Sequence, residues 1–168
     1  QSIKVGNNNK GDIKINFEKS NIEKLILNQK PTIIINCIAL TDVDKCNYDV
    51  QKAYSANVQT IGDITRSIKK ININCKLVHI STDQVYNSLE KKERNFEPDI
   101  NLNNIYSITK YMGELEARKY KKSLVVRTNF FGNLYLKNKP TYSDYIKKQL
   151  ERRKKINVAN NIYFNPIH

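Results

Sequence analysis

The alternation of short apolar runs with longer amphipathic stretches is the feature that most constrains how this chain folds. Each short run is rich in β-branched residues, and between the runs apolar residues recur at the three- and four-residue spacing of a helix. The runs lie at residues 2–5, 12–17, 32–37, 76–81 and 124–128. Strands that alternate with helices form parallel sheets, so the sequence predicts an α/β fold of the Rossmann-like, doubly wound kind.

The third run, TIIINC at residues 32–37, shows no alternation of apolar and polar side chains. A continuously apolar strand is typical of a sheet that helices cover on both faces. Ser20 and Glu23 form a capping box for a helix that ends near residue 28. Three further helices follow apolar stripes, which we place at Val58, Ile61, Thr65 and Ile68, at Ile105, Ile108, Met112 and Leu115, and within residues 142–154.

Composition narrows the classes of function. No run of about 18 apolar residues exists, so we expect no membrane span and a cytoplasmic location. Cys37, Cys46 and Cys75 lack CxxC spacing, and the two histidines, His79 and His168, lie far apart in the sequence. This pattern predicts neither a disulfide framework nor a metal site.

The formal net charge of +13 is compatible with a nucleic-acid partner. The lysines are scattered, however, and the densest cluster, at residues 147–155, is more typical of a solvated helix face than of a binding stripe. We therefore expect no nucleic-acid partner.

Tyr106 and Lys110 lie four residues apart on the third predicted helix, so their side chains share a face. An ammonium beside a phenol favours the phenolate and lowers a pKa that is ordinarily about 10, as acid–base catalysis requires. By itself the pattern is weak, because two polar residues on one helix face are common.

Polar residues follow two of the predicted strands. Ser81, Thr82 and Asp83 come at the carboxyl edge of the sheet, where open α/β folds bind ligands. A hydroxyl there could bond the substrate oxygen that the tyrosine protonates, or it could merely end the strand and cap the next turn.

The segment after residue 35 also turns polar. Asn36, Ala39 and Thr41 would face a cofactor, whereas Asp42 and Asp44 would face substrate or solvent. For either aspartate, an N-cap of the next helix is the alternative role.

In order, NCIALTDVDKC, YSANV, HISTDQVY, YSITK and VVRTNFFG resemble the extended short-chain dehydrogenase/reductase family, and within it most closely the dTDP-4-dehydrorhamnose reductases. The resemblance runs from about residue 2 to residue 168. It implies hydride transfer from NADPH or NADH to the 4-keto carbon of a nucleotide-linked deoxysugar, as in dTDP-L-rhamnose synthesis. Homodimers are common in the family, so a homodimer is one expected assembly.

The resemblance also implies residue roles. Tyr106 would protonate the alkoxide, Lys110 would lower the pKa of the tyrosine and hold the nicotinamide ribose, and Thr82 would polarise the keto oxygen. Asn57 would support the lysine through a water molecule. The remaining cofactor-binding positions are Cys37, Ile38, Ala39, Thr41, Ser81 and Thr128, and the substrate-binding positions are Asp42, Asp83, Asn129 and Phe130. Asn129 and Phe130 replace a serine and a tryptophan common in the rhamnose enzyme, which leaves the sugar open.

A dinucleotide site ordinarily has a glycine-rich turn after its first strand, and none of the five glycines here forms one. By the resemblance, residues 2–5 match the family's second strand. We therefore expect the first strand and its turn to be missing from this chain, which leaves unpaired strand edges and should prevent tight cofactor binding and activity. We interpret residues 1–155 as a partial NAD(P)-binding domain and residues 156–168 as the start of a truncated substrate-side region.

The segment VGNNNK after that strand offers no acid and one lysine, Lys10, which favours NADPH over NADH. Two alternatives stay open. Asp83 directly follows Thr82, a pattern also found in the family's dehydratases, so a nucleotide-sugar epimerase or dehydratase is one. A non-catalytic nucleotide-binding regulator is the other, although it would not need Thr82, Tyr106 and Lys110 together.

Overall fold

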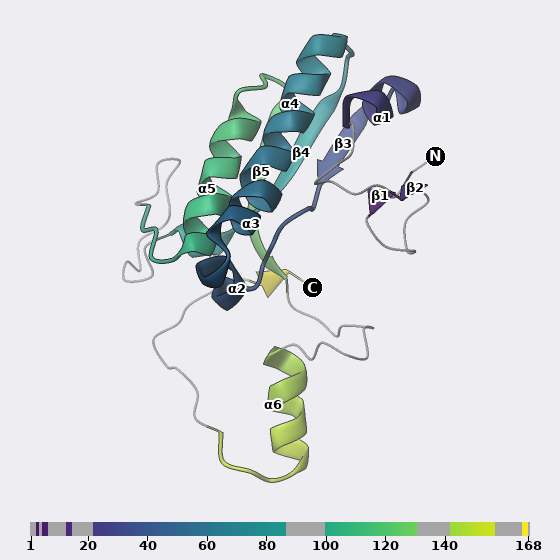
Figure 1. The fold of residues 1–168 in the computed structure, drawn as a ribbon. Helices are drawn as coiled ribbons and strands as arrows, with labels where there is room; N and C mark the ends of the chain where they lie inside the picture. The colour runs from purple at the N-terminus through teal and green to yellow at the C-terminus, as the bar shows by residue number, and fades with distance from the viewer. Residues whose placement is uncertain are drawn as a thin grey trace.

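The computed structural model describes residues 22–86, 100–130 and 142–156, together with residue 3 and residues 5–6, 13–14 and 166–167. Its main sheet is parallel, with strand order β3-β4-β5-β6 (Figure 1). The strands are β3 (Ile33–Asn36), β4 (Lys76–Thr82), β5 (Ser123–Phe130) and β6 (Pro166–Ile167). The predicted Rossmann-like α/β fold is thus confirmed.

Two short strands, β1 (Val5–Gly6) and β2 (Ile13–Lys14), form a separate parallel pair. Within the described part of the chain, neither strand pairs with β3.

The sheet register decides which side chains meet at its carboxyl edge. β3 runs beside β4 with Asn36 opposite His79, and β4 runs beside β5 with Thr82 opposite Thr128. In a parallel sheet all strands end at the same edge, so the polar ends of β4 and β5 lie next to each other.

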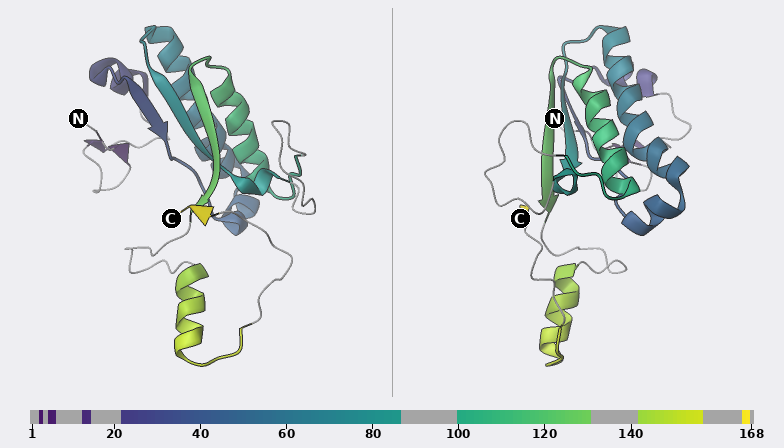
Figure 2. Two further views of the ribbon diagram at one scale, coloured as in Figure 1. Left: turned by 180° about the vertical axis from the view of Figure 1, so that it is seen from behind. Right: turned by 90° about the vertical axis from the view of Figure 1, so that its left-hand side faces the viewer.

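The helices α1 (Ile22–Gln29), α4 (Thr60–Ile71) and α5 (Ile105–Arg118) cover one face of this sheet (Figures 1 and 2). Helix α4 has the predicted buried face and ends at Asn72, whose left-handed backbone (φ 56°) closes the last turn. The core beneath α1 and α4 consists of Ile22, Ile26, Ile61, Ile64, Ile68, Cys75, Leu77 and Ala117.

The other face of the sheet is open among the described residues (Figure 2). Ile33, Ile35 and Leu124 are 54%, 63% and 59% exposed, whereas Ile34 packs against the core. The expectation of cover on both faces of β3 is therefore met on one face only, within the residues that the structure describes.

The buried face of helix α5 is not the one that its apolar pattern predicted. Its predicted apolar face was wrong, because Met112 and Leu115 are 38% and 45% exposed. The buried face instead carries Tyr106, Ser107, Thr109, Lys110, Gly113, Glu114 and Ala117. Polar side chains can lie inward when each finds a hydrogen-bond partner, and here the sheet and the neighbouring helices supply most of these partners.

Helices α2 (Val43–Tyr48) and α3 (Val50–Tyr54) were not predicted, and α6 (Tyr142–Glu151) was. Between α3 and α4 lies η1 (Ser55–Gln59), a π-helical turn, and after β4 comes the short 3-10 turn η2 (Asp83–Val85). Each helix in the described ranges is too short or too polar to cross a membrane. In the same ranges, no cluster of His, Cys, Asp and Glu has the geometry to hold a metal ion.

Candidate active site

The carboxyl end of β4 and the first two turns of α5 form the candidate site. A capping box begins α5: Asn104 Oδ1 accepts from Ser107 N at 2.8 Å, and Ser107 Oγ accepts from Asn104 N at 3.3 Å. The amide of Ile105 also donates to Asn47 Oδ1 at 3.2 Å. These bonds satisfy the free amides of the first turn and fix the direction in which Tyr106 leaves the helix.

Tyr106 is 8% exposed and packs against Cys46 and Ala53. Burial raises the pKa of its phenol, a hydrogen bond with Thr82 lowers it, and the nearby charge of Asp83 raises it further. The net pKa change is upward, so the expectation that Lys110 lowers this pKa is not met here. A buried phenolate is costly, and the ammonium of Lys110 is engaged elsewhere.

Lys110 is 2% exposed, and its Nζ donates to the carbonyl oxygen of Ile80 at 2.6 Å. Burial lowers its pKa from 10.5 to about 8, while the charges of Glu114 and Cys37 act in the opposite direction. The side chain thus connects α5 to β4 two residues before Thr82 and holds a positive charge beside the strand end.

Two threonine hydroxyls lie at the strand ends. Thr82 Oγ1 accepts from Gln84 N at 3.2 Å and lies 3.4 Å from Asp83 Oδ1, so it caps η2, and it is near enough to Tyr106 to lower the pKa of the phenol. Thr128 is 8% exposed, and its Oγ1 has no hydrogen-bond partner among the described residues. A buried hydroxyl without a partner is unusual in a native protein, so Thr128 Oγ1 has a hydrogen bond left to make.

The predicted cofactor-facing segment after β3 is partly open. Cys37 and Thr41 are exposed, and Ile38 and Ala39 are half-buried. Asn36 does not face outward: it is 2% exposed, its Oδ1 accepts from Ile38 N at 3.2 Å, and its Nδ2 donates to His79 Nδ1 at 3.0 Å.

Asn57 supports the segment after β3 with both ends of its amide. Its Oδ1 accepts from Leu40 N at 2.7 Å, and its Nδ2 donates to Leu40 O at 3.2 Å and to Thr109 Oγ1 at 3.0 Å. Asn57 therefore joins this segment to α5 one residue before Lys110. Gly113 lies against η1, where an added Cβ would collide with the carbonyl oxygen of Asn57.

The four residues predicted to bind substrate lie in different surroundings. Asp42 caps α2 by accepting from Lys45 N at 3.1 Å, which is the alternative role that the sequence left open. Asp83 and Asn129 are half-buried next to Thr82 and Thr128. Phe130 ends β5, and its side chain lies outside the described residues, as does Lys10.

Ser81, predicted to bind cofactor, instead donates its hydroxyl to Glu114 Oε1 at 2.6 Å. Sequence analysis missed Glu114 and its partner Arg127. A charged residue in the middle of the apolar run LVVRT was the available signal, because a buried arginine needs an acidic partner.

His79 was set aside as a metal ligand, and the structure buries it completely. Burial and the charge of Lys110 lower its pKa to about 3, so it is neutral. Its Nε2 has no hydrogen-bond partner in the described part of the chain. His79 thus lies buried between Asn36 and Gly113 of α5.

The sequence matches the family model described as the RmlD substrate binding domain over residues 3–168. The chain belongs to this family. A curated relative, the dTDP-4-dehydrorhamnose reductase of Aggregatibacter actinomycetemcomitans, is 30% identical over 124 residues, which are 71% of this chain and 42% of that protein. The resemblance to the extended short-chain dehydrogenases/reductases is confirmed.

Solved structures agree. A hypothetical dTDP-4-dehydrorhamnose reductase from Sulfolobus tokodaii is 33% identical, with a TM-score of 0.74, and the match covers 90% of this chain and 54% of that chain. The reductase from Bacillus anthracis str. Ames, solved in complex with NADP, is 26% identical with a TM-score of 0.67, over 84% of this chain and 48% of that chain. The chain thus spans about half the length of the relatives it matches.

The residues present fit the nicotinamide end of a dinucleotide. The orphaned hydroxyl of Thr128, the hydroxyl of Thr82 and the exposed segment that begins at Cys37 lie at carboxyl ends of parallel strands, where such ligands bind. The glycine turn that would hold a pyrophosphate is not among the residues of this sequence.

Proposed function

We propose that the full-length protein reduces the 4-keto group of a nucleotide-linked deoxysugar with NADPH or NADH, as a dTDP-4-dehydrorhamnose reductase does. One observation carries this proposal: the hydroxyl of Thr82 lies close enough to the phenol of Tyr106 to act on its pKa, and Lys110 is anchored to the same strand two residues earlier. A proton donor, a hydroxyl that can orient a keto oxygen, and a fixed positive charge are what carbonyl reduction requires of the protein.

When bound, the reduced nicotinamide supplies a hydride to the keto carbon. Tyr106 holds the proton that the oxygen then needs, because its raised pKa keeps the phenol protonated near neutral pH. Thr82 orients the keto oxygen toward that proton. The added hydride and proton together convert the ketone to an alcohol, and the tyrosine regains a proton from solvent.

Lys110 lies one turn from Tyr106 on the same helix and is held by the carbonyl of Ile80. In the proposed reaction it holds the ribose next to the nicotinamide, which places the cofactor beside the keto carbon. Its fixed position at the strand end suits that role.

The identities of the substrate and the coenzyme in this proposal are inferred from similar proteins. Reductases of the dTDP-sugar are among the curated matches, and a solved neighbour was crystallised with NADP, which together with Lys10 favours NADPH. A cytoplasmic location and a homodimer belong to the same proposal.

The test is an assay of the complete gene product with dTDP-4-keto-6-deoxy-L-mannose and NADPH. We expect NADPH oxidation that depends on the sugar and yields the 4-hydroxy product. Tight NADPH binding without turnover of any keto sugar would overturn the reductase proposal and favour a regulatory relative.

A second candidate, a nucleotide-sugar epimerase or dehydratase, has one observation in its favour. Asp83 lies beside Thr82, and its charge reaches Tyr106, as a second acid or base near the phenol would. Conversion of a nucleotide sugar without net oxidation of NADPH would support this candidate instead.

A further inference from the structure

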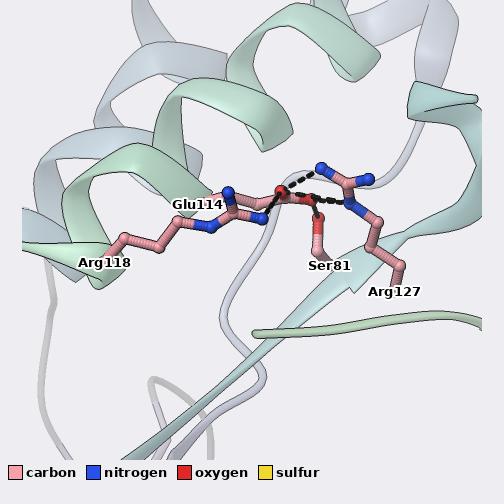
Figure 3. Close-up of polar contacts among 4 residues, drawn as sticks. All are labelled: Ser81, Glu114, Arg118 and Arg127. Carbon is pink, nitrogen blue, oxygen red and sulfur yellow. Dashed lines mark hydrogen bonds and ion pairs between the residues drawn. The ribbon is translucent and has the colours of Figure 1, made fainter. Parts of the chain in front are cut away.

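Glu114 lies one turn beyond Lys110 on α5, outside the groups used in the proposed reaction. Its side chain is fully buried, and both carboxylate oxygens accept hydrogen bonds (Figure 3). Ser81 Oγ donates to Oε1 at 2.6 Å. Arg127 donates from Nε to Oε1 at 2.9 Å and from Nη2 to Oε2 at 2.7 Å. Arg118, mostly exposed, reaches Oε2 at 3.4 Å.

These contacts join three separate elements at one carboxylate. Glu114 belongs to α5, Ser81 to β4 and Arg127 to β5, and Ser81 immediately precedes Thr82. The two-point contact between a guanidinium and a carboxylate also fixes orientation, because both groups are planar. The relative positions of α5 and the end of β4 therefore depend on this carboxylate.

Arg127 extends the same network to the other side of Thr82. Its guanidinium carbon lies 4.9 Å from the ring centroid of Tyr86, which directly follows η2. The segment that carries Thr82 is thus held before it by Ser81 and after it by Tyr86. Ser81 bonds Glu114 directly, and Tyr86 is linked to Glu114 through Arg127.

Stability alone does not explain such a cluster. A buried ion pair contributes little net free energy compared with apolar residues of the same shape, because both charges lose their hydration. What the pair supplies is a fixed geometry. Catalytic groups need such a geometry, since a misplacement of about 1 Å can reduce a rate by about 100-fold.

We propose that Glu114 is a positioning residue for the reduction proposed above, because its carboxylate fixes Thr82 on β4 relative to Tyr106 and Lys110 on α5. The negative charge of Glu114 has a second effect. It opposes the loss of the proton from Lys110, whose other titratable neighbours among the described residues are Cys37 after β3, His79 on β4 and Tyr106 one turn earlier on α5.

The decisive experiment compares Glu114→Gln with Glu116→Gln in the complete gene product. Glu116 lies on the same helix, and among the described side chains it pairs with Lys119, which is 60% exposed, so it is a matched control. We expect kcat to fall about 10- to 100-fold for Glu114→Gln at nearly unchanged KM for NADPH, and to stay within about twofold for Glu116→Gln. The alkaline limb of the pH profile should also move to lower pH for Glu114→Gln alone.

A purely structural role would lower the melting temperature but leave kcat per folded molecule and the pH profile unchanged, and that result would overturn the proposal. If Glu114→Gln does not fold, Arg127→Lys replaces it. Lysine keeps the positive charge but not the two-point contact, so kcat should fall while the pKa of Lys110 stays near 8. Wild-type kcat in Arg127→Lys would contradict the positioning role.

This inference rests on the proposed function, so one readout must not depend on turnover. The pKa of Lys110 can be followed by NMR of carbon-13-labelled lysine, with its signal assigned by loss in Lys110→Met. We expect a lower pKa in Glu114→Gln than in the wild type. An inactive wild type whose Lys110 still responds to Glu114 would refute the reductase proposal alone, whereas an unresponsive Lys110 would refute the role of Glu114.

Discussion

Helices α4 and α5 lie side by side against the same face of the sheet, yet they bury opposite kinds of side chain (Figure 1). Helix α4 directs Ile61, Ile64 and Ile68 inward. Helix α5 buries Tyr106 and Lys110 among other polar groups, and leaves an apolar stripe outside.

The buried face of α4 serves stability, whereas the buried face of α5 carries the groups of the candidate site. Complete burial of an isoleucine stabilises a protein by about 1.5–3 kcal/mol, whereas a paired buried polar group gives little net stability and a broken pair is costly. Helix α4 therefore contributes apolar burial to the core that it shares with Leu77 of β4. Helix α5 is held in place by it and by Ala117, and can use its inner face for chemistry.

Replacing Tyr106 with Phe should produce the largest effect on activity. The substitution keeps the ring in its pocket and removes the proton that the proposed reaction needs, so kcat should fall by roughly two to four orders of magnitude. Turnover of NADPH with the keto sugar measures it, and circular dichroism checks the fold. A rate equal to that of the wild type would remove Tyr106 from the mechanism.

Replacing Ile68 with Ala tests the other helix. Ile68 is 1% exposed in the core, so the lost contacts and the cavity should lower the free energy of unfolding by about 2–5 kcal/mol. Urea denaturation measures the change, and Lys69→Ala, at an exposed position on the same helix, is the control. A large loss of kcat per folded molecule would contradict the division of labour between α4 and α5.

As the pH rises, titration of Lys110 should lower the activity and raise the free energy of unfolding. Because its pKa is about 8, kcat/KM should fall about tenfold per pH unit above that value as the ammonium is lost. The unfolded chain keeps this proton up to a pKa near 10.5, so the contribution of Lys110 to unfolding free energy rises between pH 8 and 10.5. The difference between wild type and Lys110→Met isolates that contribution, and parallel falls of activity and stability would contradict it.

The smallest effect is expected on the outer face of α5. Leu115 is 45% exposed, so Leu115→Gln should change the free energy of unfolding by no more than about 0.5 kcal/mol. Thermal denaturation of the complete gene product measures it. A loss above about 2 kcal/mol would show that another surface covers this stripe in the whole protein, and the contrast between the helices would then be weaker than it is in this chain.

Sequence patterns predicted α4 well and α5 only in part, for a physical reason. The helix rule assigns apolar residues to the inside, which is correct where burial of apolar area holds the helix in place. On α5, Glu114 and Lys110 are buried because β4 and β5 supply their partners, and no local pattern shows such long-range pairing.

The candidate site shows the same limit. The predicted strand ends put the threonines Thr82 and Thr128 at the same edge, and the structure has them opposite each other on β4 and β5 because parallel strands end together. Whether Ser81 faces a ligand or a glutamate depends on which residue of α5 lies opposite it. That information is in the packing, not in the segment around Ser81.

Gly113 sets the separation between helix α5 and the π-helical turn before α4. Any side chain at this position would act as a wedge against the backbone of Asn57, and it would push the helix outward at a point less than one turn from Lys110. A displaced helix would pull Lys110 away from the carbonyl oxygen of Ile80, which its side chain now reaches at 2.6 Å. The lack of a side chain at Gly113 is therefore a condition for the hydrogen bond that holds Lys110 in the site.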